Sequence, residues 1–136
     1  MTTINEHSAL VYVMVIVSAS DGSMSDKELR TIGTVVKGLP AFSGFDSDRL
    51  VATAQQCAEI LSEPDGLETV LSLVRDALPG HLRETAYWLA LEVALTDSRV
   101  MLEEIRIVET IRRALGVDKL VAAALERGAR ARYQVV

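Results

Sequence analysis

Hydrophobic residues recur along the chain with helical spacing, and short polar, glycine or proline breaks separate the periodic segments. The run Val11–Val17 is rich in β-branched residues and by propensity alone would suit a strand. Its segment is too long for a strand, however, and continues to a glycine stop. No Asn-Gly or Asp-Gly pair lies between alternating apolar runs. The pattern predicts an all-α fold of seven helices, over about residues 3–21, 25–39, 47–61, 65–78, 81–95, 102–115 and 118–130.

Local signals place the ends of these helices. Pro40, Pro79 and Gly116 each follow a periodic segment and cannot easily continue it. Residues with the spacing of a capping box mark three helix starts, since a polar side chain there can cap the backbone amide three residues later. These pairs are Thr3 with Glu6, Ser25 with Glu28 and Asp65 with Glu68.

The sequence contains an internal repeat. A shift of 76 residues aligns the first two predicted helices with the fifth and sixth, as units of about residues 8–39 and 84–115. Matched pairs include Asp21 with Asp97, Met24 with Val100, Glu28 with Glu104, Arg30 with Arg106, Thr34 with Thr110 and Leu39 with Leu115. Repeated spacing within one chain is a stronger signal than a single motif. We predict two helical hairpins packed about a pseudo-twofold axis, with the other three helices completing one bundle.

Composition agrees with a single domain over residues 1–136. The chain is 49% hydrophobic and 24% charged, which is sufficient for a sizeable core.

Its net charge of −5 argues against binding to nucleic acid. The uncharged stretch Ser8–Ser20 is shorter than the roughly 20 residues of a membrane-spanning helix, so an integral membrane protein is not expected. Cys57 is the lone cysteine and is expected to be buried, which favours a reducing compartment such as the cytoplasm.

No catalytic set is evident in the sequence. His7 and His81 have no evident partner, His81 is expected to be exposed, and no Glu-x-x-His pair suggests a di-iron site. Tyr12 and Trp88 occupy equivalent positions in the two copies and are expected to anchor the core. We therefore predict a protein without enzymatic activity.

Charged residues outside the repeat motif allow two interpretations each. Glu92 interrupts an apolar run where its repeat partner is Ile16, and is expected on a partly exposed edge. The alternative is a buried acid paired with an Arg or contributing to a site. Arg127, Arg130 and Arg132 form a small basic tail. We interpret it as a solvated last helical turn, with a phosphate or acidic-lipid contact as the alternative.

Each repeat also carries an Asp and a Glu seven residues apart at the corner between its two helices. These are Asp21 and Glu28 in the first copy, and Asp97 and Glu104 in the second. A carboxylate at the end of a helix meets the negative end of the helix dipole and needs compensation. Glu28 can cap Ser25, but in the second copy Met101 takes the place of that serine and cannot act as a side-chain cap. Capping therefore explains the first corner better than the second.

Convergence of the two corners would bring several negative charges together, with Asp26 and Glu103 nearby. A bound cation or a basic partner would relieve their repulsion. Oxygen ligands favour Ca²⁺, Mg²⁺ or Mn²⁺, and no Cys or His close in sequence suggests Zn²⁺. The loop lacks the ligand spacing of an EF-hand, so an ion would be held by two loops together. Structural capping, metal binding and recognition of a basic partner remain three interpretations.

The corner sequence Asp21-Gly22-x-Met24-x-x-x-Glu28, with its second copy Asp97-Ser98-x-Val100-x-x-x-Glu104, resembles the TerB-like tellurite-resistance family. That family is related to the helical domain of membrane-anchored DnaJ-type co-chaperones. The resemblance covers about residues 4–125, and Ser98 stands where the second motif glycine would be. It implies a helical bundle whose paired acidic motifs, Asp21, Glu28, Asp97 and Glu104, bind a metal ion. It also implies a stress-response role with a protein partner, in an assembly at the inner face of the membrane.

Overall fold

The computed structural model describes residues 3–19, 24–96 and 102–136, without the side chains of Leu102 and Glu103. These residues form helices and no strands, which confirms the predicted all-α bundle. The α-helices are α1 (Glu6–Ser18), α2 (Asp26–Gly38), α3 (Leu50–Leu61), α4 (Gly66–Ala77), α5 (Gly80–Leu95), α6 (Leu102–Leu115) and α7 (Lys119–Arg132). Two short 3₁₀ turns, η1 (Pro40–Phe42) and η2 (Ser47–Arg49), connect α2 to α3.

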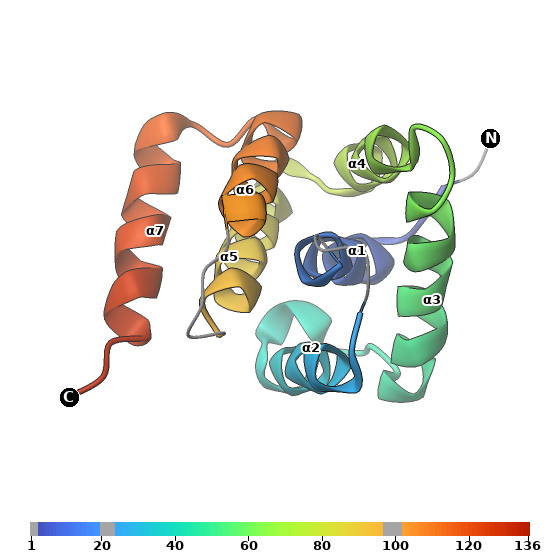
Figure 1. Cartoon of the computed structure of the whole chain (residues 1–136), viewed down its shortest axis with the longest axis horizontal. Coiled ribbons are helices and arrows are strands. Elements are labelled where there is room, and N and C mark those ends of the chain that lie inside the picture. The colour runs from blue at the N-terminus through green and yellow to red at the C-terminus, as the bar shows by residue number, and fades with distance from the viewer. Residues whose placement is uncertain (1–2, 20–23, 97–101) are drawn as a thin grey trace.

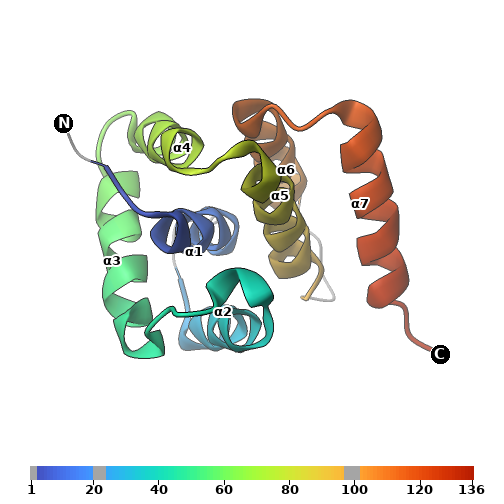
Figure 2. The same cartoon turned by 180° about the vertical axis from the view of Figure 1, so that it is seen from behind.

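Helix α1 lies at the centre of the molecule. Figures 1 and 2 show it seen along its axis, with α2, α3, α4 and α5 around it. Ten of its thirteen residues are buried, because it packs against α3, α4, α5 and α6. A helix that is apolar on every face needs such an enclosed position. The β-branched run Val11–Val17 is therefore helical, as predicted, and tertiary burial outweighs its strand propensity.

Helix α7 lies at the outer edge of the bundle, where it packs on α5 (Figure 1). Gly128 lies in this contact, where a Cβ would meet the ring of Trp88 at an ordinary van der Waals distance of 3.7 Å. Trp88 is half-buried against the core, whereas Tyr12 is fully enclosed in it. The expectation of two core anchors is thus correct for Tyr12 and partly correct for Trp88.

The helix starts follow the predicted capping pairs in one case of three. Ser25 and Glu28 form the predicted capping box at α2. At α1 the cap is Asn5, whose side chain accepts a hydrogen bond from the Ser8 amide at 2.8 Å, so the Thr3–Glu6 capping box is wrong. Asparagine is among the best N-cap residues and lies nearer the apolar segment. At α4 Asp65 precedes the helix with a positive φ of 57° and makes no side-chain cap.

The helix bounds are compatible with the predicted repeat. Shifted by 76 residues, α1 and α2 differ from α5 and α6 by at most two residues at any end. The pseudo-twofold axis itself stays a prediction. No helix in the described ranges is long and apolar enough to cross a bilayer.

Cys57 is buried, as predicted from its apolar surroundings in the sequence. Its Sγ lies 3.9 Å from the backbone oxygen of Tyr12, which ties α3 to α1. Burial raises the pKa of the thiol to about 12. The thiolate, which is the reactive form, is therefore scarce at neutral pH.

Candidate functional site

The first acidic corner joins α1 to α2. Glu28 Oε1 accepts hydrogen bonds from the amide and the hydroxyl of Ser25, each at 3.0 Å. Both bonds to Ser25 end on Oε1 of Glu28, and neither uses Oε2. Asp26 is exposed in the first turn of α2, and Met24 packs against the core beside it. Asp21 lies outside the described residues.

The last residue of α1 adds a polar group to this corner. Ser18 is 7% exposed, and its Oγ has no hydrogen-bond partner among the described residues. Buried hydroxyl groups normally have a partner, so such an atom calls for an explanation. Its repeat equivalent is Ala94, which is buried and has no polar side chain. The two corners therefore differ in chemistry.

The second acidic corner joins α5 to α6. The Thr96 hydroxyl closes the end of α5 by donating to the Val93 carbonyl at 2.8 Å. Glu104 lies half-buried in the first turn of α6. Asp97 and the side chain of Glu103 lie outside the described residues. The described part of the chain contains no group of three or more His, Cys, Asp or Glu side chains placed to hold a metal ion.

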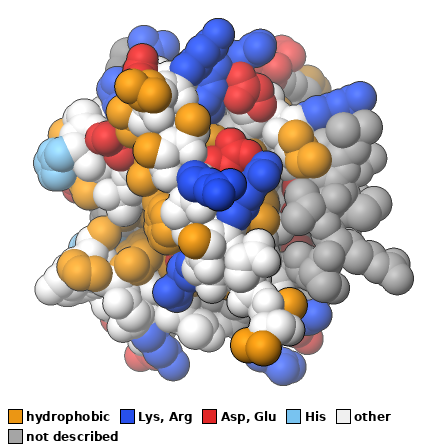
Figure 3. Space-filling view, turned by 90° about the vertical axis from the view of Figure 1, so that its left-hand side faces the viewer, with side chains coloured by type: hydrophobic (Ala, Val, Ile, Leu, Met, Phe, Trp, Pro, Cys, Tyr) orange, Lys and Arg blue, Asp and Glu red, His pale blue; other side chains and the backbone are white. Residues whose placement is uncertain are grey.

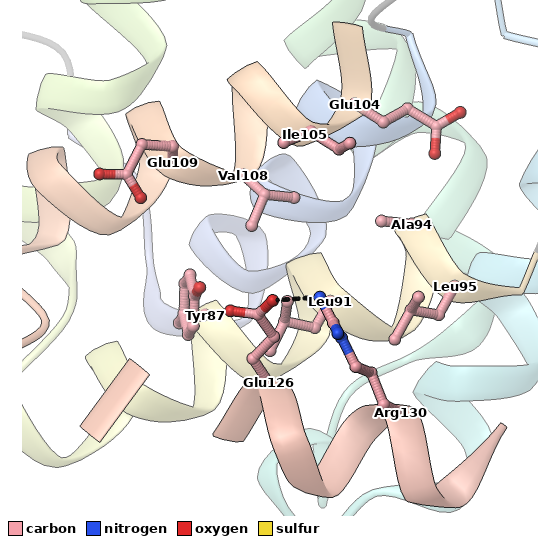
Figure 4. Close-up of a pocket in the computed structure, with 10 residues that line it drawn as sticks. All are labelled: Tyr87, Leu91, Ala94, Leu95, Glu104, Ile105, Val108, Glu109, Glu126 and Arg130. Carbon is pink, nitrogen blue, oxygen red and sulfur yellow. Dashed lines mark hydrogen bonds and ion pairs between the residues drawn. The ribbon is translucent and has the colours of Figure 1, made fainter. Parts of the chain in front are cut away.

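Glu104 also lines a cleft of about 430 Å³ between α5, α6 and α7. In Figure 4, α5 forms its floor and side chains from α6 and α7 point toward it from opposite sides. The lining is mainly apolar, with carboxylates around it. Figure 3 views the molecule from the side of α7 and shows basic, acidic and hydrophobic side chains exposed next to one another. The lining residues are Tyr87, Leu91, Ala94, Leu95, Glu104, Ile105, Val108, Glu109, Glu126 and Arg130.

Glu92 is buried, at 5% exposure, which corrects the expectation of a partly exposed edge. Its Oε1 accepts hydrogen bonds from Arg132 Nε at 2.7 Å and from the Tyr133 hydroxyl at 2.9 Å. Burial, and then the hydrogen bond to the Glu92 carboxylate, raise the pKa of Tyr133. The alternative interpretation, a buried acid paired with an arginine, is the correct one. This network fixes the end of α7 to α5.

The three arginines of the basic tail therefore have different contacts. Arg132 serves the Glu92 network, while Arg130 forms an exposed ion pair with Glu126 at 2.8 Å, four residues earlier on α7. Arg127 is exposed. All three arginines are exposed, which agrees with a solvated last turn, and Arg132 in addition pairs with the buried Glu92.

The two histidines also differ. His81 is exposed, as predicted. His7 instead has a structural environment, with Nε2 at 3.1 Å from the Ala41 carbonyl oxygen and its ring against Phe42 and Phe45. It joins α1 to the turn η1. This contact could not be predicted from the sequence, because its partners lie more than thirty residues away.

We expect Tyr133→Phe to lower the free energy of unfolding by about 1–3 kcal/mol, because it removes a donor from a buried carboxylate. In a Glu92→Leu background the same change should cost less than about 0.5 kcal/mol, since the acceptor is gone. Urea unfolding of the wild type, the two single variants and the double variant measures the coupling energy between Tyr133 and Glu92. Equal losses in both backgrounds would contradict a role for the hydroxyl in satisfying Glu92.

Comparison with known protein families tests the resemblance seen in the corner motifs. A family model described as tellurite resistance protein TerB matches residues 7–127, which is nearly the whole chain and includes both acidic corners. Searches of curated proteins and of solved structures gave no significant match. The chain belongs to the TerB tellurite-resistance family.

Proposed function

We propose that this protein is a non-enzymatic stress-response module that binds a divalent cation at its two acidic corners. The observation that carries the proposal is the family match, which includes both Asp/Glu motifs within one aligned region. The four proposed ligands are Asp21, Glu28, Asp97 and Glu104, with Asp26 and Glu103 as further donors. The bound cation would neutralise the repulsion between these carboxylates.

The described residues of the first corner support an oxygen-rich site. Glu28 caps α2 through Oε1, and Oε2 of the same carboxylate can serve as a ligand. The buried Ser18 hydroxyl at the end of α1 provides another polar atom close in sequence to Asp21. Carboxylate and hydroxyl oxygens suit Ca²⁺, Mg²⁺ or Mn²⁺.

The partner and place of action follow from the same proposal. A non-enzymatic module of this kind would act through binding, so we propose a protein partner. We place the complex in the cytoplasm, at the inner face of the membrane, on the basis of the family resemblance. Tellurite resistance is then one outcome of a wider stress response.

A second function, a metal-free scaffold or co-chaperone-type adaptor, is favoured by one observation. The capping box already gives Glu28 a structural role without any ion. In this alternative the acidic corners are caps or contacts for a basic partner. The two functions differ in whether divalent ions stabilise the fold.

Thermal unfolding of chelator-treated protein with and without millimolar Ca²⁺, Mg²⁺ or Mn²⁺ tests the proposal. An ion at 100 times its dissociation constant should add about 2.7 kcal/mol of stability, which raises Tm by roughly 10 °C for a domain of this size. The double variant Asp21→Asn/Asp97→Asn should lose this increase, because both corners then lack a ligand.

Glu59→Gln/Glu68→Gln is the matched control, since it also removes two carboxylates, from exposed positions on α3 and α4. It should keep the full increase. If no ion raises Tm, or if the control loses the increase as well, the metal proposal fails and the scaffold function takes its place.

A further inference from the structure

The cleft between α5, α6 and α7 has the dimensions of a small-molecule site. Its volume of about 430 Å³ lies within the range of roughly 300–1,000 Å³ typical of ligand pockets. On α5 the lining extends from Tyr87 to Leu95, about two helical turns or roughly 12 Å. A partner helix would require a longer groove for its repeated anchor residues. The dimensions favour a small ligand.

The floor and one wall of the cleft are hydrophobic. Leu91 and Ala94 on α5 are buried beneath it, and Val108 on α6 is 9% exposed (Figure 4). Ile105, one turn earlier on α6, is 55% exposed, although its repeat equivalent Leu29 packs against the core. An aliphatic or aromatic group in the cleft would cover this exposed surface.

The opposite part of the lining carries carboxylates. Figure 4 shows the Glu126 carboxylate directed toward the ring of Tyr87, with Glu109 on the facing helix. Burial raises the pKa of the Tyr87 hydroxyl, and the negative charges of Glu126 and Glu109 raise it further. The lining contains three glutamates and a single basic residue, Arg130.

Glu109 and Glu126 differ in how strongly arginines bind them. Glu109 is bound by Arg112 at 2.7 Å and by Arg113 at 3.2 Å, and Arg112 contacts both of its carboxylate oxygens. Arg113 is 75% exposed in its side chain, and neither arginine lines the cleft. Arg130 pairs with Glu126 through an exposed contact of the kind that contributes little to stability. A ligand cation can therefore replace the Arg130 guanidinium at Glu126.

We propose that this cleft binds a small amphiphilic organic cation. Its apolar part packs on Leu91, Ile105 and Val108, and its cationic group lies between Tyr87 and Glu126, in place of Arg130. Glu104, one of the proposed metal ligands, also lines the cleft, but the contacts proposed for the cation do not involve it, so this inference does not depend on the metal ion.

Two probes of equal chain length and opposite charge test the inference by isothermal titration calorimetry. These are octyltrimethylammonium and octyl sulfate, each used below the concentration at which it forms micelles. We expect saturable binding of the cation with one site per chain and at least tenfold weaker binding of the anion. Equal or tighter binding of octyl sulfate would assign the cleft to anions through Arg130 and overturn the inference.

Variants locate the site. Glu126→Gln should weaken binding of octyltrimethylammonium about tenfold, because a charge-assisted contact is lost. Ile105→Asn should also weaken it, and this exposed position tolerates a polar residue. Glu59→Gln, on α3 and outside the cleft, is the control and should leave binding unchanged. Unchanged affinity in both cleft variants, with their folds verified by circular dichroism, would overturn the inference.

The same titration separates this inference from the proposed metal function. The Asp21→Asn/Asp97→Asn variant should bind octyltrimethylammonium as the wild type does, with or without chelator. Loss of binding in that variant would place the probe at the acidic corners and overturn the assignment to the cleft.

Discussion

Replacing Gly66 with alanine is expected to lower the free energy of unfolding by about 3 kcal/mol or more. Gly66 begins α4 where the chain turns back from α3. A Cβ at this position would lie 2.1 Å from the Ile60 carbonyl oxygen and 2.8 Å from the Cα of Leu61. Both are backbone atoms, which cannot move aside by a rotamer change. The turn between α3 and α4 must open to accept the methyl group.

Gly80→Ala provides the matched control. Gly80 begins α5, and a Cβ there would meet no atom within 4 Å. Alanine also favours helix over glycine by up to about 1 kcal/mol, so this variant should be as stable as the wild type or slightly more stable. Urea unfolding of both variants decides the matter. Similar losses would show that backbone crowding at Gly66 is not the cause.

The second large effect is expected from Leu10→Ala in the central helix. Leu10 is fully buried in α1, which is enclosed by its neighbours on all sides. Removal of its side chain should lower the free energy of unfolding by about 2–5 kcal/mol, because the surrounding helices cannot close the cavity completely. Chemical denaturation followed by circular dichroism measures the loss.

Val51→Ala is the comparison for this change. Val51 lies on α3 and is 47% exposed, so its truncation creates no enclosed cavity. We expect a change within about 0.5 kcal/mol. A loss at Leu10 as small as that at Val51 would contradict the central role of α1.

The helices were largely predictable because their signals are local. The bounds Leu102–Leu115 predicted for the sixth helix are those observed for α6, where Gly116 with φ of 69° ends the helix. The Ser25–Glu28 capping box also depends on residues only three apart. The start of α1 was mispredicted because two candidate caps, Thr3 and Asn5, lie close together and both have suitable side chains.

Contacts between distant segments were not predictable in the same way. Glu92 and Arg132 are forty residues apart, and only the docking of α7 on α5 brings them together. The cleft has the same origin, since its lining comes from three helices. For the acidic corners, the Ser25–Glu28 contact is established, while the pairing of Asp21 with Asp97 stays a prediction.

The buried thiol of Cys57 has a practical consequence for measuring the molecule in solution. Because this is the chain's single cysteine and its pKa is about 12, thiol-directed reagents should leave the native protein unlabelled. Cysteines introduced at the exposed, repeat-related positions Arg30 and Arg106 would then be the reactive sites. Spin labels attached to these two cysteines give the distance between α2 and α6 by dipolar spectroscopy, because Cys57 carries no label.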